Sequence, residues 1–177
     1  MTELFRLKYF YLIFLSFVTL TAISSNKIAA DQKLKITADE ILTTQEEGVI
    51  EARGNAVAVD EKGSKIKSDL IIFDRNESSI SADGNIILND TDGNTYFLDH
   101  LESDTEINNL KGNEIKVRLD DGSRIVGSSL VKKDKISGLE DAEFTPCLES
   151  DYLIPKCPGW KLKAKKIFQD NENKTIY

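Results

Sequence analysis

Polar and apolar residues alternate along much of the chain, most strictly over residues 114–119, which read Glu-Ile-Lys-Val-Arg-Leu. A period of two residues predicts a β-strand with one buried and one solvent-facing side. An Asp-Gly turn at residues 120–123 separates this run from a second apolar run at residues 124–126. Such a turn between two runs is a strong hairpin signal, so the pattern predicts antiparallel hairpins.

Two short motifs recur at a nearly constant interval. The first motif comprises Gly54-Asn55, Gly84-Asn85 and Gly112-Asn113, and the second begins at Asp39, Asp69 and Asp99. Successive copies lie 28 or 30 residues apart. A fixed period of this size indicates a repeated supersecondary unit that buries its apolar face against its neighbours. Each period holds two to three short strands and leaves no room for an ordinary helix, so we expect an all-β fold.

Other segments add detail to this expectation. Further strands are expected at residues 34–38, 41–42, 49–52, 66–73, 79–82, 95–101 and 160–165, with turns at 61–64, 82–85 and 91–94. Alignment of the first and third copies predicts that Val57 and Val59 share a face with Ile115 and Val117. Residues 71–73 and 96–98 are apolar at consecutive positions, which requires a cover on both sides. That cover is either a second sheet layer or a groove for an apolar ligand.

The first 30 residues have a different composition. Arg6 and Lys8 precede an apolar run over residues 9–23, and two alanines precede Asp31. This order is typical of a secretory signal peptide, and the run is shorter than the roughly 20 residues of a spanning helix. An uncleaved N-terminal anchor is the alternative.

The charge of the remaining chain bears on its partners. Residues 1–30 contain three of the 23 basic and one of the 30 acidic residues, which leaves 20 basic and 29 acidic residues and a net charge of −9. This balance argues against nucleic acid, because phosphate binding requires a basic face. The remaining 147 residues are enough for one domain with a sizeable core.

Both cysteines, Cys147 and Cys157, lie in the segment that also holds all three prolines. In an exported protein a disulfide between them is the simplest expectation, with a contribution of up to about 3 kcal/mol. A zinc site needs four ligands, and the single histidine, His100, is distant in sequence. Pairing with cysteines outside this chain is the third possibility.

Catalytic and metal-binding patterns are weak. His100 lies in an apolar repeat copy and is interpreted as an ordinary strand residue at the edge of the core. Residues 90–94 resemble the start of a calcium loop, but its sixth position is Thr95 rather than glycine and its twelfth is Leu101 rather than glutamate. We therefore interpret this segment as a turn and expect neither an enzyme nor a cofactor.

Taken together, these motifs resemble the N-terminal periplasmic domain, termed OstA-like, of the lipopolysaccharide-assembly protein LptD, also called organic solvent tolerance protein. The resemblance rests on the opening at residues 38–41, the Gly-Asn repeat and the closing segment at 145–167, and it covers residues 31–177. The repeats are shared with the periplasmic bridge proteins LptA and LptC. The Cys-Pro-x-Trp-x-x-x-Ala pattern from Cys157 to Ala164 is the part that indicates LptD.

The resemblance implies an open, twisted antiparallel jelly roll of stacked hairpins. It divides the chain into a signal peptide (1–30), an OstA-like domain (31–145) and a Cys/Pro loop with the last strands (146–177). Its apolar interior would hold the acyl chains of lipopolysaccharide, and burial of each methylene contributes about 0.8 kcal/mol. The expected lining residues are Ile36, Ala38, Ile41, Ile50, Val57, Val59, Ile72, Ile86, Leu88, Tyr96, Leu98, Ile115, Val117 and Leu119.

The resemblance also implies partners in the periplasm at the outer membrane. An LptA-like protein would add a strand to the N-terminal edge, formed by Leu34, Lys35, Ile36, Thr37 and Ala38. The alternative is an edge that Lys33 and Lys35 merely protect.

LptD continues into a membrane barrel, so this chain is either a fragment, with that barrel and LptE as partners, or a free-standing LptA-like bridge protein. In the first case its cysteines could pair with others beyond this sequence. A structural β-helix and a periplasmic enzyme acting on polysaccharide are the alternatives from other classes.

Overall fold

The computed structural model describes residues 34–44, 48–146 and 160–177. The expected signal peptide, Lys33, Cys147 and Cys157 lie outside these ranges, and so does the disulfide predicted between the two cysteines. Within the described ranges, no helix is long and apolar enough to cross a membrane.

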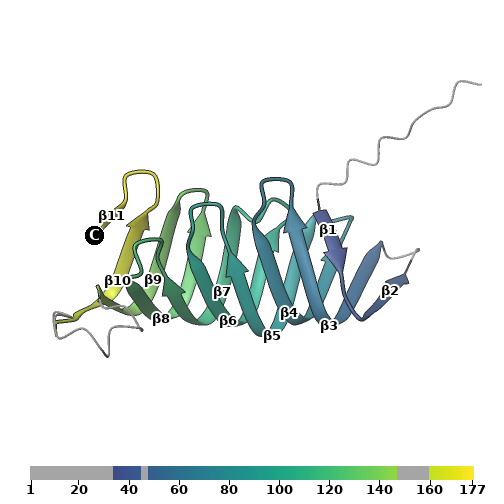
Figure 1. Ribbon diagram of the computed structural model, residues 1–177, viewed down its shortest axis with the longest axis horizontal. Coiled ribbons are helices and arrows are strands. Elements are labelled where there is room, and N and C mark those ends of the chain that lie inside the picture. The colour runs from purple at the N-terminus through teal and green to yellow at the C-terminus, as the bar shows by residue number, and fades with distance from the viewer. Residues whose placement is uncertain (1–33, 45–47, 147–159) are drawn as a thin grey trace, which may run out of the picture. The chain divides into compact units, whose positions relative to one another are not determined.

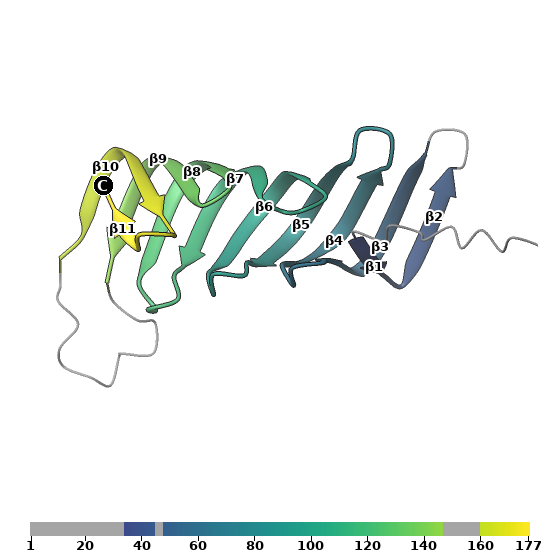
Figure 2. The same cartoon turned by 90° about the horizontal axis from the view of Figure 1, so that it is seen from above.

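The described residues form eleven β-strands in a single antiparallel sheet (Figures 1 and 2). The strands are β1 (Leu34–Thr37), β2 (Glu40–Thr44), β3 (Val49–Asp60), β4 (Lys65–Asp74), β5 (Ser79–Asn89), β6 (Thr95–Asp104), β7 (Asn109–Arg118), β8 (Arg124–Lys133), β9 (Ile136–Thr145), β10 (Leu162–Asp170) and β11 (Thr175–Ile176). From β3 onward each strand pairs with the next along the chain, while β1 and β2 both pair with β3. Because β10 pairs with β9, the last strands belong to the same sheet as the rest.

The first two Gly-Asn motifs are β-bulges. Gly54 and Asn55 stand opposite the single residue Asp69, and both have positive φ angles, 71° and 46°. Gly84 and Asn85 repeat this arrangement on β5, with φ angles of 77° and 48°. The turn expected at residues 82–85 is therefore wrong, since β5 continues to Asn89. Glycine and asparagine tolerate positive φ, which serves a bulge as well as a turn.

The two sequence motifs meet at these bulges. Asn55 Nδ2 donates a hydrogen bond of 2.8 Å to Asp39 Oδ2, and Asn85 Nδ2 donates one of 2.7 Å to Asp69 Oδ2. A Cβ atom on Gly84 would lie 2.6 Å from the same Asp69 oxygen. The motifs share one period because they form the two sides of one contact.

The third copy departs from this geometry. Gly112 lies within regular pairing to Leu101 and Leu130, and the residue with a left-handed backbone is Glu114, with a φ of 54°. Gly112 is needed for packing, because a Cβ atom there would lie 2.2 Å from Leu98 Cδ2.

This difference overturns one expectation about the faces of β3. After the bulge its fully buried side chains are Ala56 and Ala58, so Val57 and Val59 face outward. The irregular residues come at positions 54–55 in the first copy but at Glu114 in the third. The two copies are therefore out of phase by one residue, and a shift of one residue moves every side chain of a strand to the other face.

The sheet rolls over so that it covers its own apolar face. On β7, the partner of Lys132 is Leu110 and the partner of Tyr96 is Val117. Leu110 and Val117 are seven residues apart, which corresponds to about 23 Å along an extended strand, so in a flat sheet Lys132 and Tyr96 would be about as far apart. The Lys132 Nζ atom nevertheless lies only 5.5 Å from the centroid of the Tyr96 ring. The other half of the same sheet is thus the layer that covers the inner side of the apolar strands. The cover expected on both sides of residues 71–73 and 96–98 is wrong for the outer side, where Phe97 is 40% exposed.

The roll brings two rows of hairpin turns together along a line that we call the seam. Three exposed ion pairs cross it, and their partners lie 44, 43 and 54 residues apart. These pairs are Lys62 with Glu106 at 2.9 Å, Lys135 with Asp92 at 2.6 Å, and Lys174 with Asp120 at 2.6 Å. Opposite the seam, the bulges of β3 and β5 form what we call the bend line.

Candidate functional site

The middle of the roll has a fully packed apolar interior. Ile66, Leu88, Tyr96, Val117 and Ile125 lie side by side on five consecutive strands, and none is more than 2% exposed. A second such row contains Ile71, Ala82, Leu101, Leu130 and Leu139. This interior is the largest apolar feature of the described residues and the natural candidate for a lipid-binding site.

The expected lining residues divide into three groups. Seven are buried in this interior: Ile86, Leu88, Tyr96, Leu98, Ile115, Val117 and Leu119. Four face inward near the N-terminal edge and are partly or largely exposed: Ile36, Ala38, Ile41 and Ile50. Three face outward: Val57, Val59 and Ile72. The fourteen residues therefore do not form one surface.

Sequence reasoning missed several interior residues, among them Ala52, Ala56, Ala58, Ile66, Ile71, Ile80 and Ile125. On β3 the alternation changes phase at the Gly54-Asn55 bulge, and counting anew after it would have found Ala56 and Ala58. Alanine also offers a weaker signal of burial than its larger apolar neighbours.

The interior is less covered at its two ends than in its middle. Ile41 pairs with the buried Ala52 and so faces inward, yet it is 47% exposed at the N-terminal end. At the other end, Leu162 pairs with Phe144, and Leu162 is 54% exposed. The Trp160 ring lies 6.2 Å from the Phe144 ring and is also exposed. An apolar surface thus continues outward at both ends of the roll.

A buried ion pair lies directly beneath the seam. Lys132 Nζ on β8 is 3.1 Å from Asp90 Oδ2 in the turn between β5 and β6, and their side chains are 5% and 2% exposed. The Tyr96 hydroxyl donates a hydrogen bond of 2.9 Å to the same carboxylate oxygen. The ammonium group also lies near the face of the Tyr96 ring, where a cation is attracted.

Asp90 also organises its own turn. Its Oδ1 atom accepts hydrogen bonds from the backbone N–H groups of Asp92 and Asn94, at 3.0 and 2.9 Å. Burial alone would raise the pKa of Asp90, but the Lys132 ammonium and the Asn94 hydrogen bonds together lower it below its ordinary value. Burial and the nearby Asp90 carboxylate raise the pKa of Tyr96. At neutral pH the carboxylate is therefore charged, and the phenol keeps its proton.

Other buried polar groups surround this pair. On the inner face, Ser137 pairs with Lys132 on one side and with Gln169 on the other. The Ser137 Oγ, Gln169 Oε1 and Asn171 Nδ2 atoms are buried and form no short hydrogen bond, although Ser137 and Asn171 interact with the Tyr96 hydroxyl. Gln169 Nε2 donates to Asn171 Oδ1. We call the whole group the polar cluster: Asp90, Tyr96, Lys132, Ser137, Gln169 and Asn171.

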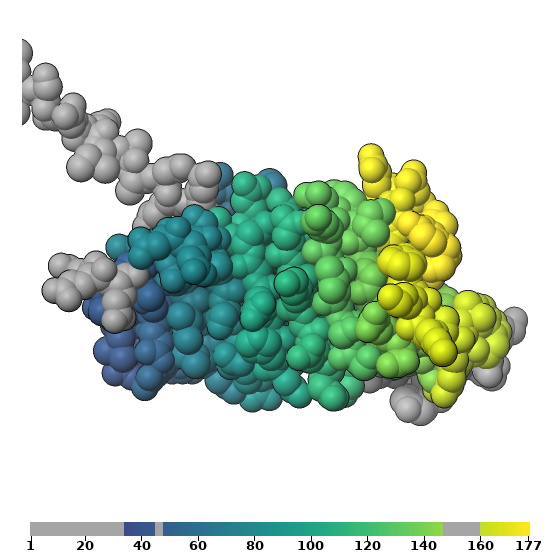
Figure 3. Space-filling model, turned by 180° about the vertical axis from the view of Figure 1, so that it is seen from behind, coloured from purple at the N-terminus to yellow at the C-terminus, as the bar shows by residue number. Residues whose placement is uncertain are grey.

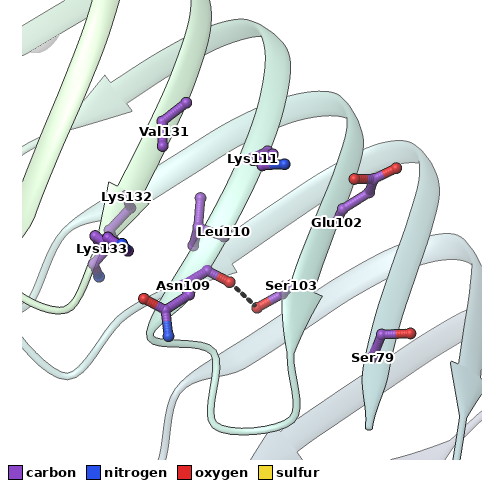
Figure 4. Close-up of a pocket in the computed structure, with 9 residues that line it drawn as sticks. All are labelled: Ser79, Glu102, Ser103, Asn109, Leu110, Lys111, Val131, Lys132 and Lys133. Carbon is purple, nitrogen blue, oxygen red and sulfur yellow. Dashed lines mark hydrogen bonds between the residues drawn. The ribbon is translucent and has the colours of Figure 1, made fainter. Parts of the chain in front are cut away.

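Two shallow cavities border the seam. One, of about 200 Å³, lies between its two rows of turns and includes Asp92, Asp120, Gln169 and Lys174 in its lining. The other, of about 300 Å³, lies where β6 and β8 end and β7 begins (Figure 4). In the second cavity Ser103 Oγ donates a hydrogen bond of 3.2 Å to the Asn109 carbonyl oxygen.

The single histidine lies away from the interior. His100 Nδ1 is 2.6 Å from Asp83 Oδ1, and its Nε2 atom is 3.8 Å from Glu102 Oε1. The hydrogen bond to Asp83 is the main cause of a raised pKa of His100. No cluster of three potential metal ligands occurs among the described residues. The segment at residues 90–94 is a turn whose aspartate accepts backbone hydrogen bonds, as interpreted from the sequence.

Both edges of the sheet offer strands for pairing. At the N-terminal edge β1 and β2 pair only with β3, and every residue of β2 is exposed. At the other edge β11 covers only the end of β10, which leaves residues 162–166 without a strand beyond them in the described part. On the side shown in Figure 3, the atoms of successive strands between these edges form one continuous surface.

Comparison with known proteins bears on the fold. No family model matches the chain, and no curated protein matches it by sequence. A crystal structure that does match is that of LptH from Pseudomonas aeruginosa, described as the LptA-homologous periplasmic component of the conserved lipopolysaccharide transport device. The TM-score is 0.53 with 14% sequence identity, and the match covers 74% of this chain and 93% of LptH. The chain has an LptA-like fold.

This likeness confirms the expected fold class, an all-β antiparallel jelly roll. At 14% identity it concerns the fold alone. A parallel β-helix is excluded for the described residues, because all their strand pairs are antiparallel. The finer resemblance to LptD stays a prediction.

Proposed function

We propose that the chain binds lipopolysaccharide inside its rolled sheet and passes it through the periplasm as a component of a transport bridge. The observation that carries this proposal is the apolar interior, which is enclosed in the middle and exposed at both ends, at Ile41 and Leu162. Once the middle of the roll opens, an acyl chain that enters at one end can leave at the other without crossing water. Burial of its methylenes would contribute about 0.8 kcal/mol each.

The seam gives the lipid a way in from the side. The packed middle has no room for acyl chains unless the two rows of turns move apart. Side-chain contacts such as that between Lys62 and Glu106 hold the rows together and can break without disrupting strand pairing. The LptA-like fold supports the proposal, since LptH is described as part of a lipopolysaccharide transport device. The proposal contains no catalytic step.

The direct test is photo-crosslinking from the interior. A photoreactive residue at Val117, which is 2% exposed on the inner face, should capture lipopolysaccharide when cells that export the protein are irradiated. The matched control is Lys116, the preceding residue, which faces outward. Capture from Lys116 but not from Val117 would show that the lipid lies outside the roll and would contradict the proposal.

A bridge also needs contacts with its neighbours. We propose that an LptA-like protein adds a strand to the N-terminal edge, whose β1 strand pairs only with β3. Proline at Lys35 or Thr37 should weaken this association, because proline lacks the N–H group that strand pairing uses. Equal binding of an LptA-like partner by the proline variants and the unchanged chain would argue against docking at this edge.

The chain can take one of two places in the bridge. We propose that it is the N-terminal part of LptD, on the basis of the closing segment around Trp160, with the LptD barrel and LptE as its further partners at the outer membrane. A free-standing LptA-like bridge protein is the alternative. An antibody to the chain distinguishes them in cell extracts, because the 177 residues alone have a mass of 19.8 kDa and LptD is far larger.

A further inference from the structure

The polar cluster is unusual because it buries two opposite charges next to the apolar interior. Lys132 and Asp90 come from opposite sides of the seam, 42 residues apart in sequence, and both side chains are almost fully buried. Two buried charges are costly to desolvate, and apolar residues of the same size often stabilise a protein as well or better. Stability alone therefore does not explain why this position holds a lysine.

The cluster also has more hydrogen-bonding capacity than the protein uses. Ser137 Oγ, Gln169 Oε1 and Asn171 Nδ2 are buried and form no short hydrogen bond, and Ser137, which is 0% exposed, and Asn171 interact only loosely with the Tyr96 hydroxyl. Buried polar groups are nearly always paired, so unpaired ones indicate a missing partner such as a ligand. Two of these atoms, Ser137 Oγ and Asn171 Nδ2, can donate a hydrogen bond and lie near the buried Lys132 ammonium group, which suits a polar anion.

We propose that the polar cluster binds the phosphate group of an amphiphile, and that the Asp90 carboxylate holds this site closed by occupying Lys132 until the phosphate displaces it. This inference deepens the proposed function and rests on it. When the seam opens, Asp90 moves away with its turn, and its carboxylate stays paired with the N–H groups of Asp92 and Asn94. Lys132 then meets the phosphate, so neither charge is left without a partner.

The donors of the cluster suit a phosphate. An ammonium group binds phosphate as a point charge, and hydroxyl and amide groups donate to its remaining oxygens. Lys132, Tyr96, Ser137 and Asn171 supply these donors from β8, β6, β9 and the turn after β10. The adjoining interior rows that contain Leu88 and Leu130 would hold the acyl chains of the same molecule.

A lipid without phosphate cannot take over the place of Asp90 on Lys132. The exchange therefore gives selectivity: the closed roll admits a phosphorylated lipid and resists an otherwise identical lipid that lacks the phosphate. Asp90 acts as an intramolecular competitor, so its removal should favour the phosphorylated lipid further.

Two lipid probes test this directly: lipid A with its phosphates and the same lipid A after enzymatic dephosphorylation. Equilibrium capture is measured for the full chain and for the variants Asp90→Asn and Lys132→Gln. The unchanged chain should prefer the phosphorylated probe. Asp90→Asn should bind that probe about tenfold more tightly, as expected for one charge-assisted contact. Lys132→Gln should bind both probes equally. Lys135→Gln, which removes the exposed seam pair with Asp92, is the matched control and should keep the preference.

The outcomes separate the two proposals. Equal binding of both probes by the unchanged chain would overturn the phosphate site and leave the lipid-binding function intact. If neither probe binds the unchanged chain or any variant, and Val117 captures no lipid, the proposed function itself is overturned. Circular dichroism checks the fold of each variant. If Asp90→Asn does not fold because Lys132 is left unpaired, the double variant Asp90→Asn/Lys132→Gln replaces it, and a phosphate preference in that double variant would contradict the site.

Discussion

The bend line and the seam are opposite sides of the same roll, and they are held by different forces. At the bend line the backbone is continuous, and each of the two bulges adds a hydrogen bond such as that between Asn85 and Asp69. At the seam, no backbone hydrogen bond joins the two rows of turns among the described residues. Side chains alone close it. The roll can therefore open along the seam while every strand pair stays intact.

Substitution of Lys132 should have the largest effect on stability. Lys132→Met leaves the Asp90 carboxylate buried without its counter-charge, which should lower the free energy of unfolding by about 3–5 kcal/mol. Chemical denaturation measures this value. The double variant Asp90→Asn/Lys132→Met should recover much of the loss, because it removes the second charge as well. Equal losses in the single and double variants would show that the pair does not hold the seam.

The same pair predicts how acid acts on the roll. Because the pKa of Asp90 is lowered in the folded state, its contribution to stability is present above the ordinary aspartate pKa, about 3.9. It is lost as the pH falls through the lowered value. Below about pH 4 the unchanged chain should therefore lose unfolding free energy more steeply than the double variant. Parallel curves for the two proteins would contradict this assignment.

The bulges of the bend line should be the next most sensitive positions. Gly84→Ala places a Cβ atom 2.6 Å from Asp69 Oδ2 in a residue with a φ of 77°, which should cost about 2 kcal/mol. Gly63→Ala is the control, since Gly63 also has a positive φ but has no atom within 4 Å of the added Cβ. Its cost should be about 1 kcal/mol, the backbone contribution alone. Denaturation midpoints compare the two.

The bulge hydrogen bond can be tested separately from the backbone. Asp69→Ala removes the acceptor of the Asn85 side chain and should cost about 1 kcal/mol. Asp99 occupies the equivalent place in the third copy, where the asparagine side chain makes no such bond in the described structure, and Asp99→Ala should change stability by less than about 0.5 kcal/mol. Equal costs for both substitutions would show that the aspartates act by another means.

The exposed ion pairs of the seam should matter least for stability. Lys62→Ala breaks the contact with Glu106, and both side chains are more than half exposed. The loss should be the smallest of the series and should shrink in high salt, because surface pairs are screened. Under the proposed function the same substitution should raise the rate of lipid capture, since a looser seam should admit lipid faster. Slower capture by Lys62→Ala would contradict opening at the seam.

The fold class was accessible from sequence because alternation and Asp-Gly turns are local signals. The turn at residues 120–123 is confirmed by the hydrogen bond of 2.8 Å from Leu119 N to Ser123 O. The faces of the strands were harder to predict, because the bulges at Gly54 and Gly84 change the phase of the alternation. The Gly-Asn motif occurs three times and suggested the same local geometry each time. The first two copies are bulges at the motif itself, whereas in the third copy the irregular residue is Glu114.

The polar cluster could not be predicted for a different reason. Lys132 belongs to the run Val-Lys-Lys, and two adjacent lysines on a strand suggest a solvated surface. Its partner lies 42 residues away in a turn. Only the rolling of the sheet brings the two together, and no local pattern encodes that curvature. Burial of a charge is a property of the tertiary structure rather than of its segment.

The 16-residue separation of Asp39 from Asn55, repeated between Asp69 and Asn85, has a consequence for how such a protein can change in size. A whole 30-residue unit inserted in register adds two strands, or about 9.6 Å of length, and leaves the cross-section unchanged. An insertion of one residue within a strand would instead turn the following side chains inside out. The length of the conduit can therefore evolve in discrete steps, independently of its width.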